Sequence, residues 1–272
     1  MADLGVSIAL IACIVLFSEA ARRATKRLCS DDYRIYLVEA VSTFQLCACT
    51  HELKLLAVMD RVESHIGLTL TYIMTIVHVS TFHEASCNPA TVLEHVRRGT
   101  TSAKGAAVLI SGQFVAAIIA QFSVASVRSL GLSDLHSRHE KLGYRCFDPI
   151  SGTLLQATGV ELACAFCMQA TVMHIHKLDA KLRIHAVAAV VTSLVYAGGY
   201  ISGAVSNAVL AFSIQFPCSG HTYPEYCFVY WLGPVLGMSS CILLFEKIIP
   251  FLSGKSTIGK TTGNFSVTKK TQ

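Results

Sequence analysis

Asn88-Pro89-Ala90 and Asn207-Ala208-Val209 are two short asparagine boxes at matching places in the two halves of the chain. Each box follows an apolar segment whose end is loosened by small or polar residues, Val79-Ser80-Thr81 in the first half and Ala197-Gly198-Gly199 in the second. Each box also opens a further run of helix-compatible residues. A pair of interrupted hydrophobic segments in corresponding halves indicates a pore or site at the midplane of a membrane protein.

The composition places these boxes in a membrane protein. Of the 272 residues, 53% are hydrophobic and only 14% are charged, whereas a soluble domain usually carries about 25% charged residues. Apolar runs such as 105–127 and 186–216 are too long and too little alternating for barrel strands. Backbone groups in hydrocarbon must be satisfied internally, so these runs are expected to be helices. We therefore expect an all-α membrane protein surrounded by the lipid bilayer.

Several functional classes have little support in this sequence. The net charge is only +5, and the basic residues lie between apolar runs rather than in one patch, so we expect no nucleic-acid partner. The chain shows no Ser-His-Asp set, phosphate loop or dinucleotide fingerprint, so we expect neither an enzyme nor a cofactor. Cys164-Ala-Phe-Cys167 has metal or redox spacing, but it lies in an apolar run without a second pair. Helix packing is the favoured reading, and no metal site is expected.

Seven apolar segments predict helices that cross the membrane, with bounds at 4–18, 34–57, 66–82, 105–127, 153–174, 185–203 and 226–250. The first segment is short, and its charges follow the apolar core rather than precede it. It therefore differs from a cleaved signal peptide and resembles a signal anchor or an extra span. The alternative is that 4–18 lies in the membrane interface instead of crossing.

The basic connections set the expected orientation. They lie at 22–27, 97–104 and 177–183, and the tail carries Lys255, Lys260, Lys269 and Lys270. If these connections are cytoplasmic, the spans alternate correctly and the C-terminus is cytoplasmic. The sequon Asn264-Phe265-Ser266 would then be unused. Cys146 and Cys218 fall in connections on the other, lumenal side, where a disulfide between them is permitted but not required.

Two glutamates in the apolar segments strengthen the relation between the halves. Glu161 follows Glu39 by 122 residues, much as Asn207 follows Asn88 by 119. A carboxylate within a membrane span is costly and usually marks function or a packed polar contact. Each half thus reads as a glutamate span, a short span, an asparagine box and a third span, which is the pattern of an inverted-topology repeat.

The first box has the chemistry of a helix start. Proline is well suited to the first helical turn, and the asparagine before it can cap the helix with its side-chain oxygen. Asn88-Pro89-Ala90 therefore predicts a half-helix over about 89–98, with the amide N–H groups of Asn88 free to donate. Two such starts facing each other at mid-membrane would orient a chain of water molecules and repel cations, including protons.

Four motifs resemble the aquaporin (major intrinsic protein) family, and the resemblance covers about 34–250. These motifs are Leu37–Phe44, Val160-Glu161-Leu162, Ser202–Asn207 and Val229–Gly237. Other segments resemble the unorthodox, or super-aquaporin, branch of the family. These segments are Thr43–Leu53, Lys181–His185, Ser18–Arg23, Cys164–Cys167 and Cys218–Thr222.

The resemblance implies an aquaporin fold, an inverted repeat of three spans plus a half-helix, here with an additional N-terminal hydrophobic helix. The expected organisation is a hydrophobic helix with a basic connection at 1–33, a channel domain at 34–250 and a flexible cytoplasmic tail at 251–272. Glu39 and Glu161 are implied to brace the half-helices by accepting from loop N–H groups. The resemblance also implies a homotetramer in an intracellular membrane such as the endoplasmic reticulum, and transport of water, glycerol or hydrogen peroxide.

The chain departs from the family pattern at the second box. Ala208 stands where the family has proline, and Leu210 stands where water-selective members have arginine. The other constriction positions fall on Leu68, Val195 and Ala204. A neck of these apolar residues is expected to favour glycerol or peroxide over fast water flow. The alternative is a poorly conducting protein that keeps the fold for organellar structure or partner binding. A coupled transporter has less support, because the spans show few paired charges.

Overall fold

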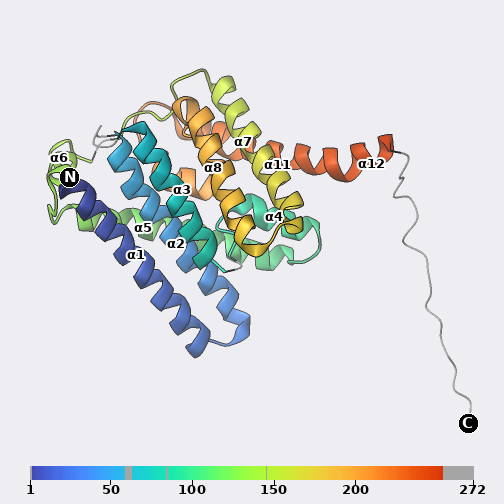
Figure 1. The fold of residues 1–272 in the computed structure, drawn as a ribbon, viewed down its shortest axis with the longest axis horizontal. Coiled ribbons are helices and arrows are strands. Elements are labelled where there is room, and N and C mark those ends of the chain that lie inside the picture. The colour runs from blue at the N-terminus through green and yellow to red at the C-terminus, as the bar shows by residue number, and fades with distance from the viewer. Residues whose placement is uncertain (1, 59–62, 84, 145, 254–272) are drawn as a thin grey trace, which may run out of the picture.

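A computed structural model describes residues 2–58, 63–83, 85–144 and 146–253, and within these ranges all regular structure is helical (Figure 1). The long helices are α1 (Ala2–Leu28), α2 (Asp31–Val58), α3 (Ser64–Thr81), α5 (Ala103–Arg128), α7 (Leu154–His174) and α8 (Ala180–Ser202). The shorter elements are α4 (Pro89–Arg97), α6 (Asp134–Lys141), η1 (Ile175–Lys177) and α9 (Ala208–Ile214). The sequon at Asn264 and the tail lysines lie outside the described residues.

The last long helix changes its winding along its length. It consists of α10 (Tyr223–Cys227), η2 (Phe228–Leu232), α11 (Gly233–Leu243), η3 (Leu244–Ile248) and α12 (Ile249–Leu252). Both η2 and η3 are π-helical turns. Pro234 and Pro250 each follow a π-helical turn closely, and a proline lacks the N–H that a regular helix would use at that point. Figure 1 shows this helix extending beyond the other helices, toward the C-terminus.

Five stretches of helix are long and apolar enough to cross a membrane, namely Asp3–Leu28, Ala103–Arg128, Leu154–Lys177, Ala180–Ser202 and Tyr223–Leu252. The predicted spans at 34–57 and 66–82 are also helices, α2 and α3, although they are not among these five. Helix α2 is less apolar than these five because it carries Glu39, Glu52 and Lys54. Glu39 and Glu52 are nonetheless buried within the bundle. The crossing of the membrane by α2 and α3 remains a prediction.

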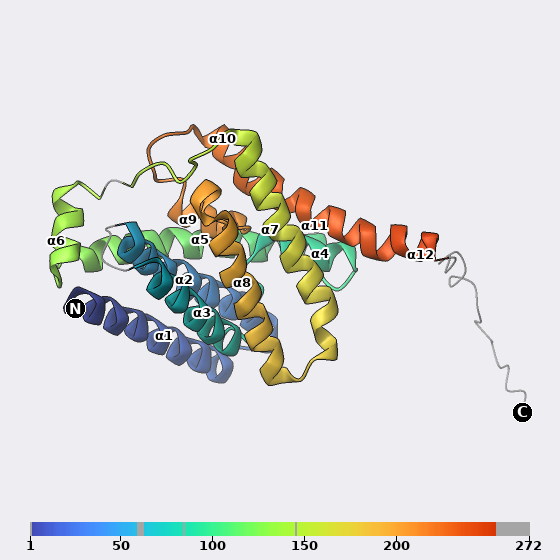
Figure 2. The same ribbon diagram turned by 45° about the horizontal axis from the view of Figure 1, so that its top comes forward.

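The short helices α4 and α9 lie among the longer ones (Figure 2). Helix α4 packs against α5 and α11, α9 packs against α5 and α2, and the two short helices contact each other. Around them, α2 packs on α5, α7 on α11, and α3 on α8. This arrangement places the two helix starts, Pro89 and Ala208, in the interior of the bundle.

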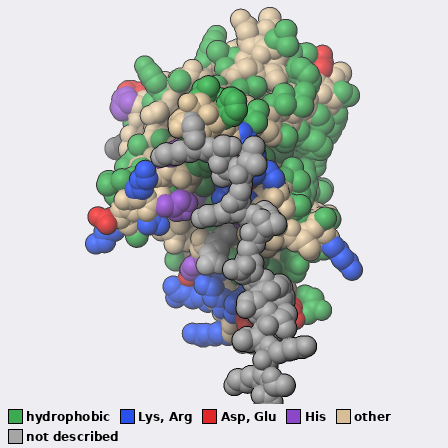
Figure 3. Space-filling view, turned by 90° about the vertical axis from the view of Figure 1, so that its right-hand side faces the viewer, with side chains coloured by type: hydrophobic (Ala, Val, Ile, Leu, Met, Phe, Trp, Pro, Cys, Tyr) green, Lys and Arg blue, Asp and Glu red, His purple; other side chains and the backbone are tan. Residues whose placement is uncertain are grey.

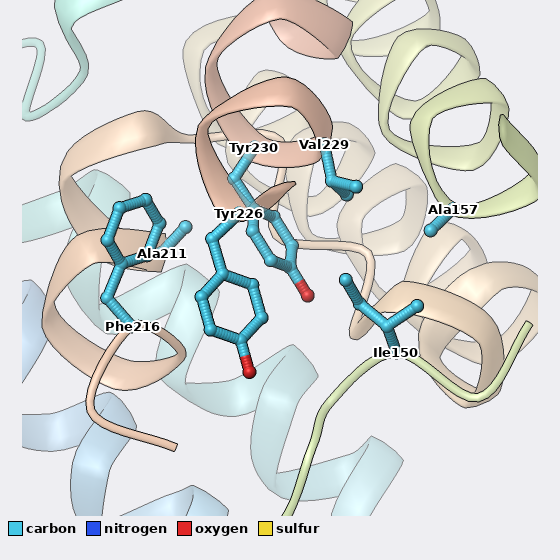
Figure 4. Close-up of a cluster of buried hydrophobic side chains, with 7 residues drawn as sticks. All are labelled: Ile150, Ala157, Ala211, Phe216, Tyr226, Val229 and Tyr230. Atoms are coloured by element: carbon cyan, nitrogen blue, oxygen red, sulfur yellow. The ribbon is translucent and has the colours of Figure 1, made fainter. Parts of the chain in front are cut away.

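A hydrophobic cluster fixes α9 against α7 and the last long helix. Its members are Ile150, Ala157, Ala211, Phe216, Tyr226, Val229 and Tyr230 (Figure 4). The rings of Phe216 and Tyr226 stack with centroids 5.5 Å apart. Buried aromatic rings supply much of the packing energy of such a core, and a tyrosine hydroxyl there needs a polar partner. The Tyr230 hydroxyl finds one by donating to the Ser202 carbonyl at 2.7 Å.

The contact between α7 and α11 depends on a glycine. A Cβ atom at Gly237 would overlap the carbonyl oxygen of Leu162 on α7 and would lie 3.0 Å from the Cβ of Ala165. The obstacle is mainly backbone, which cannot rotate away as a flexible side chain can. The two helices therefore approach closely only because position 237 has no side chain.

We predict that Gly237→Ala destabilises the protein, because the added methyl group pushes α11 away from α7. Overpacking of this kind costs about 1–3 kcal/mol, which should appear as a lower thermal unfolding midpoint in detergent. Gly112→Ala on α5 is the matched control, since a Cβ there meets nothing within 4 Å. An equal midpoint for the two variants would contradict this account of the α7–α11 contact.

The first helix is longer than the sequence predicted. The expectation that the basic residues 22–27 form a connection is wrong, because α1 continues through them to Leu28. Helix α1 runs antiparallel to α2 at the edge of the bundle (Figures 1 and 2). Its start lies beside α6, where Asp3 Oδ1 accepts from the Leu135 N–H at 3.4 Å. This course along α2 favours a crossing helix over one that lies in the interface.

Arg22 is fully buried between α1 and α2. Its guanidinium donates to Gln45 Oε1 at 2.8 Å and pairs with Glu19 Oε2 at 3.2 Å, and it lies 3.5 Å from Ser42 Oγ. Gln45 in turn donates to Thr81 Oγ1 on α3 at 3.1 Å. The arginine lies six residues, or about 9 Å, before the end of α1. A residue expected in a solvated connection thus joins three helices inside the bundle.

We predict that Arg22→Met destabilises the protein, because it leaves Gln45 without its buried donor, while Glu19 keeps Arg23. The loss of a hydrogen bond from a charged group costs about 1.5–3 kcal/mol. Arg23→Met is the control, since Arg23 also pairs with Glu19 but is exposed, and such pairs contribute little. Thermal unfolding of both variants in detergent makes the comparison. Similar unfolding midpoints for the two variants would show that the buried Arg22 contributes no more to stability than the exposed Arg23.

Candidate channel centre

The two asparagines cap the two short helices. Asn88 has an extended backbone, and its Oδ1 accepts from the Ala90 N–H at 3.0 Å, with Pro89 at the first helical position. Asn207 Oδ1 accepts from the N–H groups of Val209 at 3.1 Å and Leu210 at 3.3 Å. The second box has lost the proline, yet its asparagine caps two N–H groups instead of one. Both residues therefore satisfy helix-start donors that would otherwise be unpaired.

The two boxes also bond to each other across the centre. Asn207 Nδ2 donates to the Cys87 carbonyl at 2.7 Å, and Asn88 Nδ2 donates to the Ser206 carbonyl at 3.4 Å. Each side-chain amide carries two N–H donors, and this contact uses one of them. The arrangement brings the N-terminal ends of α4 and α9 together, each with the positive end of its backbone dipole directed inward.

The residue before each asparagine adopts the same unusual backbone conformation. Cys87 has φ +50° and Ser206 has φ +44°, both in the left-handed region that non-glycine residues rarely occupy. Strained backbone of this kind persists only where its surroundings fix it. Here the conformation accompanies two carbonyls that accept from the asparagine of the other half. The matching conformations show that the two loops are built alike.

Glu39 on α2 holds the first loop. It accepts from the N–H groups of Ser86 at 2.9 Å and Cys87 at 2.6 Å. It also accepts from Gln113 Nε2 on α5 at 2.6 Å, and the Glu39 side chain is almost completely buried. Loop N–H groups within a membrane protein need internal acceptors, and a carboxylate can supply several.

Glu161 on α7 holds the second loop in the same way. It accepts from the N–H groups of Val205 at 3.1 Å and of Ser206, and from the Ser202 hydroxyl at 2.6 Å. Ser202 occupies the role that Gln113 has in the first half, but it comes from the end of α8 rather than from the third helix of its half. Glu39 and Glu161 therefore hold their loops in the same way but have different supporting side chains.

The four predicted constriction residues are placed on different elements and are all apolar. Leu68 lies on α3, Val195 on α8, Ala204 in the second loop and Leu210 on α9. Ala204 is buried, and a Cβ at Gly198 would lie 3.4 Å from its Cβ, so it packs against α8. Leu210 packs against the hydrophobic cluster that joins α2 and α5. The structure thus joins Asn88 to Asn207 through the two loops, whereas the four constriction residues come from four separate elements.

Three polar residues that bond to the loops or short helices were missed by the sequence analysis, namely Gln113, Ser202 and Lys54. Gln113 and Ser202 bond to the two bracing carboxylates. Lys54 reaches from α2 to the far end of α9, where its Nζ donates to the Ile214 carbonyl. The available signal was a polar or charged residue within an otherwise apolar segment, which carries an energetic cost in lipid and so indicates a partner.

A disulfide ties down the loop that follows α9. The bond joins Cys146 and Cys218, the pair that the sequence analysis allowed, and the Ser219 N–H donates to the Cys146 carbonyl at 3.2 Å. Cys164 is buried on α7 and Cys167 is exposed. Within the described ranges, no three His, Cys, Asp or Glu side chains form a group that could hold a metal ion.

The other end of α4 is fixed by ion pairs. Glu94 accepts from Arg97 and Arg98 at 2.6 Å each, and both arginines reach Glu246 on the last long helix. The hydrogen bond from Arg97, together with that from Arg98, holds the pKa of Glu94 below its ordinary value. The half-helix is thus held at its start by Asn88 and at its end by this charge cluster.

Comparisons with known proteins agree with this geometry, although no family model matches the chain. Aquaporin-11 of Homo sapiens is 36% identical over 259 residues, 95% of each chain. Aquaporin-11 of Equus caballus is 35% identical over 262 residues, 96% of each chain. Aquaporin-12 of Mus musculus is 32% identical over 257 residues, 93% of this chain and 89% of the relative. The chain is a multi-pass membrane protein of the aquaporin family, in the branch that contains aquaporin-11 and aquaporin-12.

Proposed function

We propose that this protein is a passive channel for water or small neutral solutes, with glycerol and hydrogen peroxide as the favoured candidates. The observation that carries the proposal is the meeting of two capped helix starts at Asn88 and Asn207. Each asparagine keeps a second amide N–H, which can donate to an oxygen of a passing molecule. Neither residue titrates, so the passage needs no proton transfer and no cofactor.

The half-helix dipoles account for the preference for neutral molecules. Two positive helix ends directed at one point raise the electrostatic potential there, so cations are repelled while neutral molecules pass. Water, glycerol and hydrogen peroxide all present oxygen acceptors that the asparagine amides can orient. Glu39 and Glu161 support this role because they keep both loops, and hence both helix starts, in position.

The apolar constriction positions support a neck that is wider and less polar than one guarded by arginine. Leu68, Val195, Ala204 and Leu210 offer no side-chain hydrogen bond to a single file of water. A wider neck admits solutes larger than a water molecule, and the carbon skeleton of glycerol makes favourable contacts with apolar walls. This favours glycerol or peroxide over rapid water flow.

The setting of the proposed channel is an intracellular membrane such as the endoplasmic reticulum, with the C-terminus cytoplasmic and a homotetramer as the assembly. The resemblance to the unorthodox branch supports the membrane and the tetramer. The basic connections at 97–104 and 177–183 support the orientation, because cytoplasmic loops carry an excess of Lys and Arg. In Figure 3 most Lys and Arg side chains lie in the lower part of the face, while its upper part is mainly hydrophobic.

We predict that Asn207→Leu lowers solute flux in proteoliposomes by about tenfold, since it removes the helix cap, the bond to Cys87 and the amide donor. Asn88→Leu should act in the same direction. Asn264→Gln, outside the two boxes, is the matched control and should leave flux unchanged. Glycerol and peroxide permeabilities are measured by light scattering and a peroxide-sensitive dye. Water permeability at the level of an orthodox aquaporin, without glycerol or peroxide flux, would overturn the solute preference.

A second function is a poorly conducting protein that keeps the fold for organellar structure or partner binding. One observation favours it. Each asparagine already uses one amide donor on the opposite loop, so these hydrogen bonds join the two loops at the centre. The absence of a proline from the second box and of an arginine from position 210 also favours a poorly conducting protein. Wild-type vesicles with no more flux than empty vesicles, together with an intact cellular role for Asn207→Leu, would select this function.

The orientation makes a separate prediction. Asn264 should carry no glycan when the full chain is expressed in cells, because a cytoplasmic sequon is not reached by the glycosylation machinery. Glycosidase treatment followed by gel electrophoresis provides the measurement, with a sequon inserted in the connection 128–133 as the positive control. A mobility shift that depends on Asn264 would reverse the proposed orientation.

A further inference from the structure

Lys54 is held at the end of α9 that points away from the channel centre. Its Nζ donates to the Ile214 carbonyl, to Gln215 Oε1 and, at 3.3 Å, to Sγ of Cys218. Ile214 is the last residue of α9, so the ammonium faces the negative end of that helix dipole. The three donors of the ammonium are therefore occupied by neutral acceptors, and its position is fixed.

The charge of Lys54 has no carboxylate partner among the described residues, in contrast to the two buried arginines. Arg22 pairs with Glu19, and Arg128 lies 3.5 Å from Glu52. The ion pairs found in the described ranges do not include Lys54, whose acceptors are a carbonyl, an amide oxygen and a disulfide sulfur. Among the described residues its positive charge is therefore opposed by the partial charges of these acceptors and of the α9 C-terminus, and not by a carboxylate.

The two residues that bind the ammonium, Ile214 and Gln215, lie near two of the apolar constriction positions. Ile214 follows Leu210 by four residues on α9, which is about one helical turn or 6 Å along the axis. Gln215, which accepts from Lys54, also reaches the second loop, because a Cβ at Gly203 would lie 2.6 Å from Gln215 Nε2. Gly203 directly precedes Ala204. Lys54 is thus linked to the neighbourhood of position 210 and, through Gln215, to that of position 204.

We propose that Lys54 supplies the positive charge that excludes protons and small cations from this channel, in place of the cation missing at position 210. The inference rests on the proposed channel function and adds a selectivity residue to it. Helix α2 packs against α1, α3, α5 and α9. Leu46, Thr50 and Lys54 nevertheless keep partial exposure at four-residue spacing, while Cys47 and Ala48 between them are buried. We assign this stripe to the part of α2 that faces the proposed channel.

The physical effect is electrostatic and selective. A unit charge that is partly withdrawn from water acts over several ångströms more strongly than a solvated one, so it raises the barrier for a cation in the adjacent neck. A neutral solute has no net charge to oppose and passes unaffected. Because Lys54 is anchored to the backbone of α9, the charge stays beside the neck instead of swinging into bulk water.

Reconstituted full-length protein tests this role with three variants. Lys54→Gln removes the charge but keeps N–H donors for the Ile214 carbonyl, Lys54→Arg keeps the charge, and Lys104→Gln removes an exposed lysine near the start of α5. Proton flux is followed with an enclosed pH-sensitive dye, and glycerol flux by light scattering. We expect the ratio of proton to glycerol permeability to rise about tenfold or more in Lys54→Gln. It should stay at the wild-type value in Lys54→Arg and Lys104→Gln.

A purely structural role for Lys54 would change unfolding temperature or both fluxes together without changing their ratio. That result would overturn the inference, as would a Lys54→Arg variant that leaks protons like Lys54→Gln. If Lys54→Gln folds poorly, Lys54→Met replaces it and is compared with the double variant Lys54→Met, Leu210→Arg. Proton exclusion that is lost in the single variant and regained in the double variant supports the electrostatic role. Absence of glycerol flux in the wild type overturns the channel and this inference together. A normal glycerol flux with an unchanged ratio overturns the inference alone.

Discussion

Two buried carboxylates hold the irregular backbone of this protein in the middle of a helical bundle. A loop that enters a membrane protein exposes N–H groups that neither lipid nor a regular helix can satisfy. Glu39 and Glu161 accept those N–H groups from the loops that precede Asn88 and Asn207. Without these acceptors the loops could not stay buried, and the two short helices would have no fixed starting points.

The two halves have the same arrangement of loop, asparagine cap and bracing carboxylate, but different side chains fix them. In the first half a proline fixes the helix start, and Gln113 on a long helix supports the carboxylate. In the second half the proline is absent, and Asn207 compensates by capping two N–H groups. The second half also recruits Ser202, whose carbonyl is in turn held by Tyr230. The second half thus uses different side chains from the first to fix its less rigid helix start.

The sequence predicted the elements that follow from local patterns. Apart from α1, which ends ten residues beyond the predicted segment, apolar runs located the long helices to within about five residues. The box chemistry located the start of α4, because capping and proline preferences act over a few residues. It also paired Glu39 with Glu161 by their spacing. These signals are strong because lipid penalises every unsatisfied polar group.

Features that depend on contacts between distant segments could not be predicted in this way. The basic residues after Ser18 were expected in a loop, yet α1 continues to Leu28 and Arg22 donates to Gln45 on α2. The crossed bonds from Asn88 and Asn207 to the opposite loops depend on backbone conformations at Cys87 and Ser206 that no local propensity favours. The contact between Lys54 and α9 likewise could not be predicted, because the two bonded residues lie 160 positions apart in the chain.

The pairing of Arg22 with Glu19 has a consequence for how the protein is made. Helix α1 leaves the ribosome before α2, so Arg22 reaches the membrane while Gln45 is not yet present. A lone arginine in hydrocarbon is costly, but Glu19 lies one turn earlier on the same helix and provides the counter-ion at once. Helix α1 therefore carries the counter-ion for its buried arginine within its own sequence, before α2 adds the hydrogen bond to Gln45.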